Sequence, residues 1–228
     1  MRASPTAGWA DLRIALSAIL AISGAILREA ALVLLYAFKP LTTALIFLTA
    51  WRIPNPVNAR YRRAVLIGIA LSLCGDVFLM LPKEIAPSGF LLGLSSFLVA
   101  HLFFLRALTS DTKLFAKPLV LLGFLLFGGA NLAVLWPGLA PGLKVPVVAY
   151  VACLAAMAAQ AAARHLQWRS QGSRLAALGG LAFMLSDTLL AYNKFYAPIP
   201  VSPLWILGTY YTALLLIARS VAASEPTA

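Results

Sequence analysis

Residues 72–81 read SLCGDVFLML, and a related stretch, MLSDTLLAY, occupies residues 184–192. Each stretch places one carboxyl group, that of Asp76 or Asp187, inside a run of apolar side chains. Ionisable side chains at membrane depth are costly, and they face a partner or a water-filled cavity. The two aspartates therefore predict a buried functional site, and the rest of the chain must supply the groups that face them.

Apolar residues dominate the whole chain. Of the 228 residues, 62% are hydrophobic and 11% are charged, whereas a soluble domain holds about 25% charged residues. Eight segments approach the ~20 apolar residues that cross a bilayer. We therefore expect an all-α integral membrane bundle of eight transmembrane helices in a single domain, residues 1–228. The segments are 11–27, 31–51, 63–82, 88–108, 117–136, 143–163, 174–193 and 202–219.

Basic residues favour alternate connections between these segments. Thirteen of the 18 Lys and Arg residues lie in or beside one set, four lie in the other set, and Lys39 lies within a span. The positive-inside rule then predicts cytoplasmic N and C termini. The net charge of +11 is thus a topology signal with some affinity for anionic membrane lipids, and it does not indicate nucleic-acid binding. The alanine-rich composition favours a bacterial inner (plasma) membrane.

An internal repeat is visible. Arg63 precedes Asp76 by 13 residues, and Arg174 precedes Asp187 by the same interval. The spacing predicts two parallel four-helix halves, about 1–110 and 113–228, related by an axis along the membrane normal. Chance matching among helices rich in Leu, Ala and Gly is the alternative.

Several polar side chains are expected at one depth. At about 1.5 Å of rise per residue, Asp76 and Asp187 both lie roughly 20 Å from the cytoplasmic edge. Lys39 and Asn131 reach a similar height when they are counted from the nearest flanking basic residue. By the same count His101 lies nearer the cytoplasmic end, as do the tyrosines Tyr210 and Tyr211. Polar residues placed by chance would not be expected to share one depth in the membrane. Asp76, Asp187, Lys39 and Asn131 therefore predict one polar layer.

Two carboxyls and one amine suit acid–base chemistry. If the aspartates are close, one of them should hold a proton while Lys39 keeps the other ionised. A protonated acid beside an ionised base can carry out general acid–base catalysis without a metal or cofactor. A purely structural ion pair that joins three helices is the alternative. Lys39 could also meet a phosphate group.

Other catalytic motifs are missing from the sequence. It contains no HExxH, GxSxG, Walker or strand-linked GxGxxG motif. His101 and His165, on different segments, do not resemble a metal site. Cys74 and Cys153 lie in apolar runs and indicate neither a disulfide framework nor a CxxC metal site. His101 can orient a helix, relay a proton or join two helices, whereas Gln160 is expected to join helices.

Four motifs carry a family resemblance over nearly the whole chain. They are FKPLTTALIFLTAW near 38–51, LCGDVFLMLP at 73–82, FLVAHLFFLRAL at 97–108 and LAFMLSDTLLAYNKF at 181–195. In this order they resemble the YhhN-like family of eight-span membrane proteins, which includes the lysoplasmalogenases. One departure is the last span, where the family often carries a glutamine and this chain has YYTALL. A role for that glutamine therefore does not transfer.

The resemblance implies hydrolysis of the vinyl ether bond of lysoplasmalogens, or of related lysolipid enol ethers, to a fatty aldehyde and a glycerophospho-base. Asp76 and Asp187 would share the acid and base roles, with Lys39 tuning the pair and His101 secondary. The lysophospholipid headgroup would lie near the non-cytoplasmic face. The candidate substrate contacts are Asn131, Tyr192, Asn193, Lys194 and Tyr211.

Two other functions stay open. The same buried layer suits a proton-coupled transporter of a small amphipathic solute, whose halves usually carry broken helices near the midplane. The layer could also serve as interhelical glue in a lipid-binding or structural membrane protein. Aldehyde release and solute uptake would separate these hypotheses, and the oligomeric state stays open.

Overall fold

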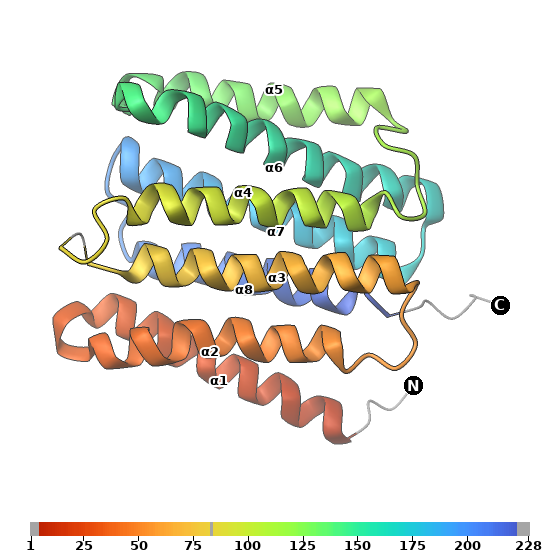
Figure 1. Cartoon of the computed structure of the whole chain (residues 1–228), viewed down its shortest axis with the longest axis horizontal. Helices are drawn as coiled ribbons and strands as arrows, with labels where there is room; N and C mark the ends of the chain where they lie inside the picture. The colour runs from red at the N-terminus through yellow and green to blue at the C-terminus, as the bar shows by residue number, and fades with distance from the viewer. Residues whose placement is uncertain (1–4, 83, 223–228) are drawn as a thin grey trace.

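The computed structural model describes residues 5–82 and 84–222, and these residues form α-helices with no strand. Arg2 and Lys83, which entered the charge argument, lie outside them. Eight α-helices follow one another with short connections (Figure 1). They are α1 (Pro5–Leu27), α2 (Leu32–Trp51), α3 (Ala59–Met80), α4 (Gly89–Leu108), α5 (Pro118–Leu135), α6 (Pro141–Trp168), α7 (Gln171–Phe195) and α8 (Ser202–Arg219), with 3₁₀ turns after α1 and after α5.

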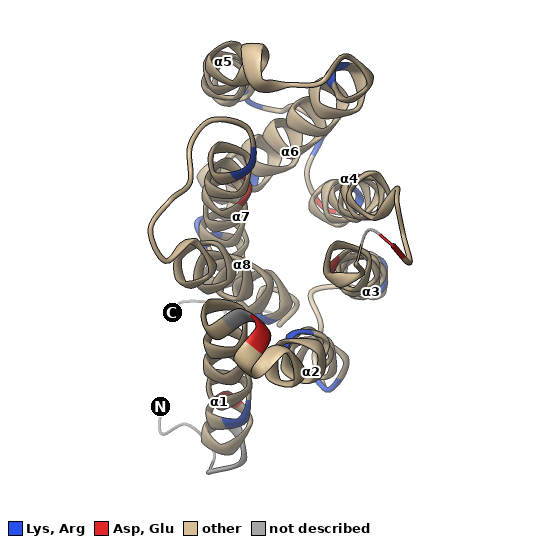
Figure 2. Ribbon diagram, turned by 90° about the vertical axis from the view of Figure 1, so that its left-hand side faces the viewer, with Lys and Arg blue, Asp and Glu red and all other residues tan. Residues whose placement is uncertain are grey.

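Six of the helices form a closed ring. α2 packs on α3, α3 on α4, α4 on α6, α6 on α7, α7 on α8, and α8 returns to α2. Figure 2 shows this ring end-on, with α3 and α4 opposite α7 and α8. α1 lies outside the ring against α2 and α8, and α5 lies outside it mainly against α6. The two halves of the chain are therefore joined where α4 packs on α6 and where α8 packs on α1, α2 and α3.

Both aspartate helices begin in the same way. The side chain of Asn58 accepts a hydrogen bond from the Tyr61 amide at the start of α3, and Ser170 accepts one from the Ser173 amide at the start of α7. Such N-caps satisfy backbone N–H groups that have no partner within the helix. The caps fix where each helix starts, and thus the depth at which its aspartate is carried.

The segments predicted from hydropathy match the helices to within a few residues, with two larger differences. α1 begins at Pro5, six residues before the expected start, and α6 continues to Trp168, five residues past the expected end. Both extensions lie at the basic end of the bundle, where polar residues continue a helix that hydropathy no longer marks. α2 and α6 run uninterrupted through Pro40 and Pro146.

Seven helices, α1 to α7, are long and apolar enough to cross a membrane. α8 has 18 residues and carries Tyr210, Tyr211 and Arg219, and it is not among these seven. A count of eight spans therefore stays a prediction. The described ends of the chain, the start of α1 and the end of α8, lie at the same end of the bundle (Figure 1).

Polar side chains stabilise the end of the bundle at which α1 begins and α8 ends. Gln160 on α6 donates to the backbone carbonyls of Leu108 and Lys113 and accepts from the Phe115 amide at 2.9 Å. Arg164, one turn further along α6, makes a bidentate ion pair with Asp111 at 2.7 Å. Gln160 thus joins α6 to the last residue of α4, as its position in the sequence suggested, and also to the α4–α5 connection.

Candidate functional site

A cavity of about 640 Å³ lies inside the helix ring. It is lined by side chains from every helix of the ring and from α5, and it reaches the connections at the end of the bundle opposite the first residues of α1. Its volume is in the range of sites for small molecules, which are mostly apolar with a few placed polar groups. Both carboxyl groups singled out from the sequence, those of Asp76 and Asp187, line this cavity.

Asp76 is fully engaged by donors. Lys39 Nζ on α2 lies 3.3 Å from Asp76 Oδ1, and the two side chains are only 9% and 2% exposed. Thr43 Oγ1 and the Tyr210 hydroxyl both donate to Oδ2, at 2.8 and 2.6 Å. Buried charges persist where they are paired and hydrogen-bonded, so this arrangement suits an ionised Asp76 opposite a protonated Lys39. Three helices, α2, α3 and α8, meet at this carboxylate.

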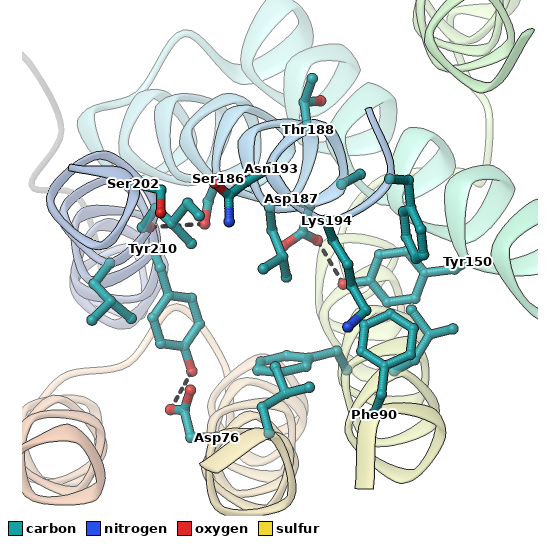
Figure 3. A pocket seen from close by; sticks show the side chains of 18 of the residues that line it. Asp76, Phe90, Tyr150, Ser186, Asp187, Thr188, Asn193, Lys194, Ser202 and Tyr210 are labelled. Atoms are coloured by element: carbon teal, nitrogen blue, oxygen red, sulfur yellow. Dashed lines mark hydrogen bonds between the residues drawn. The ribbon is translucent and has the colours of Figure 1, made fainter. Parts of the chain in front are cut away.

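Asp187 has a more open environment. The Tyr150 hydroxyl on α6 donates to its Oδ2 at 2.6 Å, and the side chain is 14% exposed. Figure 3 shows Asp187 beside Tyr150 and Asp76 beside Tyr210, on facing walls of the cavity. The two carboxyls thus differ: one is neutralised by a cation, and the other faces the cavity with a phenol as its donor.

His101 lies behind Asp187 rather than on the cavity surface. The fully buried ring has Nε2 3.9 Å from Asp187 Oδ2, too far for a hydrogen bond, and neither ring nitrogen has a hydrogen-bond partner among the described residues. The ring packs edge-on against Tyr150 and Phe183, with centroids 5.2 and 4.6 Å away. The depth count placed His101 nearer the cytoplasmic end than the aspartates, whereas in the structure its ring lies beside the Asp187 carboxyl.

Aromatic rings separate the two carboxyl clusters at the floor of the cavity. Phe97 on α4 and Phe183 on α7 pack edge-on against each other and against Tyr210, with centroids 5.7 to 6.5 Å apart. The glycine Gly75 on α3 allows this approach, since a Cβ there would meet the Phe97 ring at 2.6 Å. These rings give the floor a rigid, water-excluding surface.

Lys194 and Asn193 line the open end of the cavity. The Lys194 amine lies over the Phe90 ring, 4.2 Å from its centroid, which is the distance range of a cation–π contact. The Asn193 side chain accepts from the Ile199 amide at 2.9 Å and so shapes the α7–α8 connection. Because Lys194 follows Asp187 by seven residues, about two helical turns, both side chains lie on one face of α7.

Asn131 on α5 also lines the cavity, and its amide donates to the Phe127 carbonyl of its own helix at 2.8 Å. Tyr192 does not line it and instead packs on Tyr196, with centroids 5.6 Å apart. Tyr211 does not line it either; it is buried with its ring against that of Tyr210. Successive residues of a helix point about 100° apart, so only Tyr210 of the adjacent pair faces the cavity. These placements give no support to Tyr192 and Tyr211 as substrate contacts.

Two groups that contact the carboxyls did not enter the sequence-based site. Tyr150 lies in a segment, 143–163, from which the sequence suggested only Gln160 as a polar contact, and Tyr210 was expected nearer the cytoplasmic end than the aspartates. The length of a tyrosine side chain carries its hydroxyl well away from its own Cα, so the residue count along the helix does not locate it. Thr43, four residues after Lys39 on the same face of α2, was the one group that spacing could have found.

Comparisons with known proteins identify a family and several named relatives. The YhhN family profile matches residues 34–221. A human protein named lysoplasmalogenase TMEM86A is 33% identical over 166 residues, 71% of this chain and 66% of the relative. A pig protein named lysoplasmalogenase TMEM86B is 34% identical over 186 residues, 81% of this chain and 73% of the relative.

A third relative is bacterial. A Mycobacterium bovis protein named lysoplasmalogenase is 28% identical over 188 residues, 79% of this chain and 67% of the relative. The chain spans just under two thirds of the length of the human TMEM86A protein and 60% of the human TMEM86B protein. No solved structure matches the chain.

Proposed function

Because the chain belongs to the YhhN family, we propose that it is a membrane-embedded hydrolase that cleaves the vinyl ether bond of lysoplasmalogens. The products are a fatty aldehyde and a glycerophospho-base. The names of the relatives support the substrate class. The observation that carries the proposal is the pair of unlike carboxyls in one cavity, Asp187 with a phenol donor and Asp76 with a cation.

In the first step Asp187 is the acid. A vinyl ether is activated when its β-carbon is protonated, which moves the π electrons into the new C–H bond and leaves an oxocarbenium ion. Asp187 donates that proton and becomes a carboxylate beside the cation. The Tyr150 hydroxyl, 2.6 Å from Asp187 Oδ2, orients the acid and stabilises the carboxylate that forms. The aromatic floor excludes bulk water while the cation exists.

In the second step Asp76 is the base. A water molecule adds to the oxocarbenium carbon and gives one proton to Asp76, which yields a hemiacetal. The hemiacetal hydroxyl then returns a proton to Asp187, the carbon–oxygen bond to glycerol breaks, and Asp76 gives its proton to the leaving oxygen. Both carboxyls are thereby restored, and one water molecule is consumed. Two carboxyls with separate roles are also the arrangement of glycosidases.

The lysolipid headgroup fits the open end of the cavity. Lys194 lies seven residues beyond Asp187, about 10 Å along the helix axis, which matches the reach from a vinyl ether through glycerol to the phosphate. Basic residues concentrate at the opposite end of the bundle, so the positive-inside rule puts the open end on the non-cytoplasmic side. The proposed enzyme crosses the membrane eight times and has both termini in the cytoplasm.

Aldehyde release from lysoplasmalogen in D₂O tests this function. Protonation at the β-carbon places one deuterium on the aldehyde carbon next to the carbonyl, which mass spectrometry of the trapped aldehyde detects. Asp187→Asn should reduce the rate by about 10²–10⁴-fold, the usual contribution of a general acid, and Asp76→Asn should also reduce it. Asp11→Asn is the matched control, because Asp11 pairs with Arg219 far from the cavity.

Two outcomes would contradict the proposal. Aldehyde without deuterium at that carbon would exclude β-carbon protonation. No aldehyde at all, combined with solute uptake into liposomes that depends on Asp187, would identify a transporter.

A further inference from the structure

We propose that the hydrocarbon chain of the lysolipid leaves the cavity sideways, between α5 and α7, and continues into the surrounding lipid. This inference rests on the proposed function, because the vinyl ether must lie at Asp187. The headgroup then occupies the open end of the cavity, and the chain needs another way out. The floor of the cavity and its α2–α3 wall are both obstructed.

The floor of the cavity leaves no room for a chain. Phe183 and Phe104 are fully buried beneath the carboxyl clusters, and Leu154 is buried beside them. The void that remains on the cytoplasmic side of these rings, between Phe104 and Met157, is about 10 Å³, which barely holds one water molecule. A long alkenyl chain therefore cannot pass straight through the bundle.

The α2–α3 wall of the cavity is tied by a hydrogen bond. Tyr36 on α2 lines the cavity and donates to the Met80 carbonyl at the end of α3, at 3.2 Å. The ion pair of Lys39 with Asp76 joins the same two helices deeper in the membrane. Opening this side would break polar contacts in an apolar medium, where each is costly to lose.

Among the described residues, no side-chain hydrogen bond of this kind joins α5 to a neighbouring helix. The amide of Asn131 bonds to the Phe127 carbonyl on α5 itself. Phe127 lines the cavity and is 51% exposed, so little other protein packs on this side chain. Thr188, the next residue of α7, points about 100° away from Asp187 around the helix axis and also lines the cavity (Figure 3). The cavity therefore extends around α7 toward α5.

Gly128 lies where α5 approaches α6 and α7. It is buried and lines the cavity, and a Cβ at this position would meet Val151 at 2.9 Å and the end of Met184 on α7 at 3.9 Å. Its neighbour Gly129 is exposed, and a Cβ there would meet nothing within 4 Å. The two adjacent glycines thus provide a test position and a matched control on the same turn of α5.

Photolabelling of the wild-type protein tests the route directly. The probe is an alkyl-ether lysophosphatidylcholine with a diazirine at the end of its chain, which binds but carries no vinyl ether to cleave. Label on peptides of α5 or the facing side of α7, removed by excess unlabelled lysoplasmalogen, is the expected result. Competed label on α1 or α2 would overturn the proposal.

Chain-length selectivity gives a second, independent readout. Gly128→Leu should lower aldehyde release from a hexadecenyl substrate about tenfold relative to an octenyl substrate, in line with the discrimination that apolar pockets achieve. Gly129→Leu should keep the wild-type ratio. Asn131→Trp fills the same gap and tests the route even if Gly128→Leu fails to fold.

The outcomes separate this inference from the proposed function. If the wild type releases aldehyde from neither substrate, the proposed function fails. If it releases both, and Gly128→Leu or Asn131→Trp keeps the wild-type ratio, the route between α5 and α7 is wrong while the hydrolase stands.

Discussion

The ion pair of Lys39 with Asp76 makes a quantitative prediction about stability. Replacing Lys39 with Met keeps the length of the side chain and removes its charge, which leaves the Asp76 carboxyl, 2% exposed, without its cation. Removing one partner of a buried pair costs about 3–5 kcal/mol, because an uncompensated charge remains. At roughly 2–4 °C per kcal/mol for a chain of this size, the melting temperature of Lys39→Met should fall by about 10 °C.

The double variant Lys39→Met/Asp76→Asn should recover at least half of that loss. An amide at position 76 carries no charge to compensate, and its oxygen can still accept from Thr43 and Tyr210. Arg219→Met is the control, because the ion pair of Arg219 with Asp11 is half exposed, at 40% and 47%, and such pairs contribute about 0–1 kcal/mol.

Thermal unfolding in one detergent, followed by intrinsic fluorescence, measures all of these variants. If Lys39→Met melts within the range of the Arg219→Met control, the pair is not desolvated and the argument for an ionised Asp76 fails. If the double variant melts no higher than Lys39→Met, the loss comes from packing of the lysine stem and not from an unpaired charge.

Two further predictions concern groups at opposite ends of the bundle. Tyr150→Phe removes the hydroxyl that donates to Asp187 at 2.6 Å, so kcat/KM for aldehyde release should fall roughly tenfold to a hundredfold, with the melting temperature nearly unchanged. Gln160→Leu leaves the Phe115 amide and the Lys113 carbonyl without the partner they have now, which should cost about 1–3 kcal/mol of stability. Because Gln160 lies far from the cavity, kcat should not change; a large fall in kcat would contradict the separation of the two ends.

Hydropathy and spacing predicted most of the fold for a physical reason. Each membrane helix must satisfy its own backbone hydrogen bonds within the segment, so its existence depends on local sequence alone. Asp76, Asp187 and Lys39 were found in the same way, since a charge within an apolar segment stands out without knowledge of its neighbours. The extra turns of α1 and α6 escaped because polar residues at a membrane surface carry no hydropathy signal.

The partners of the carboxyls could not be predicted from the sequence. They depend on which helix faces which, and Tyr150 and Tyr210 come from helices that are neighbours of the aspartates only in the closed ring. Tyrosine is also common at membrane interfaces, so its presence alone does not identify a site. The contrast between a paired Asp76 and an open Asp187 follows from the rotation of each helix about its axis, which residue spacing along one chain does not determine.

The closed ring has a consequence for biosynthesis. Lys39 and Thr43 precede Asp76, so the carboxylate can meet both as soon as α2 and α3 are in the membrane. Its third donor, Tyr210, lies 134 residues further along the chain and is synthesised only with α8. A nascent chain that stops before α8 therefore holds a half-satisfied acid in the bilayer, and quality-control proteases that recognise unassembled polar helices would find one there.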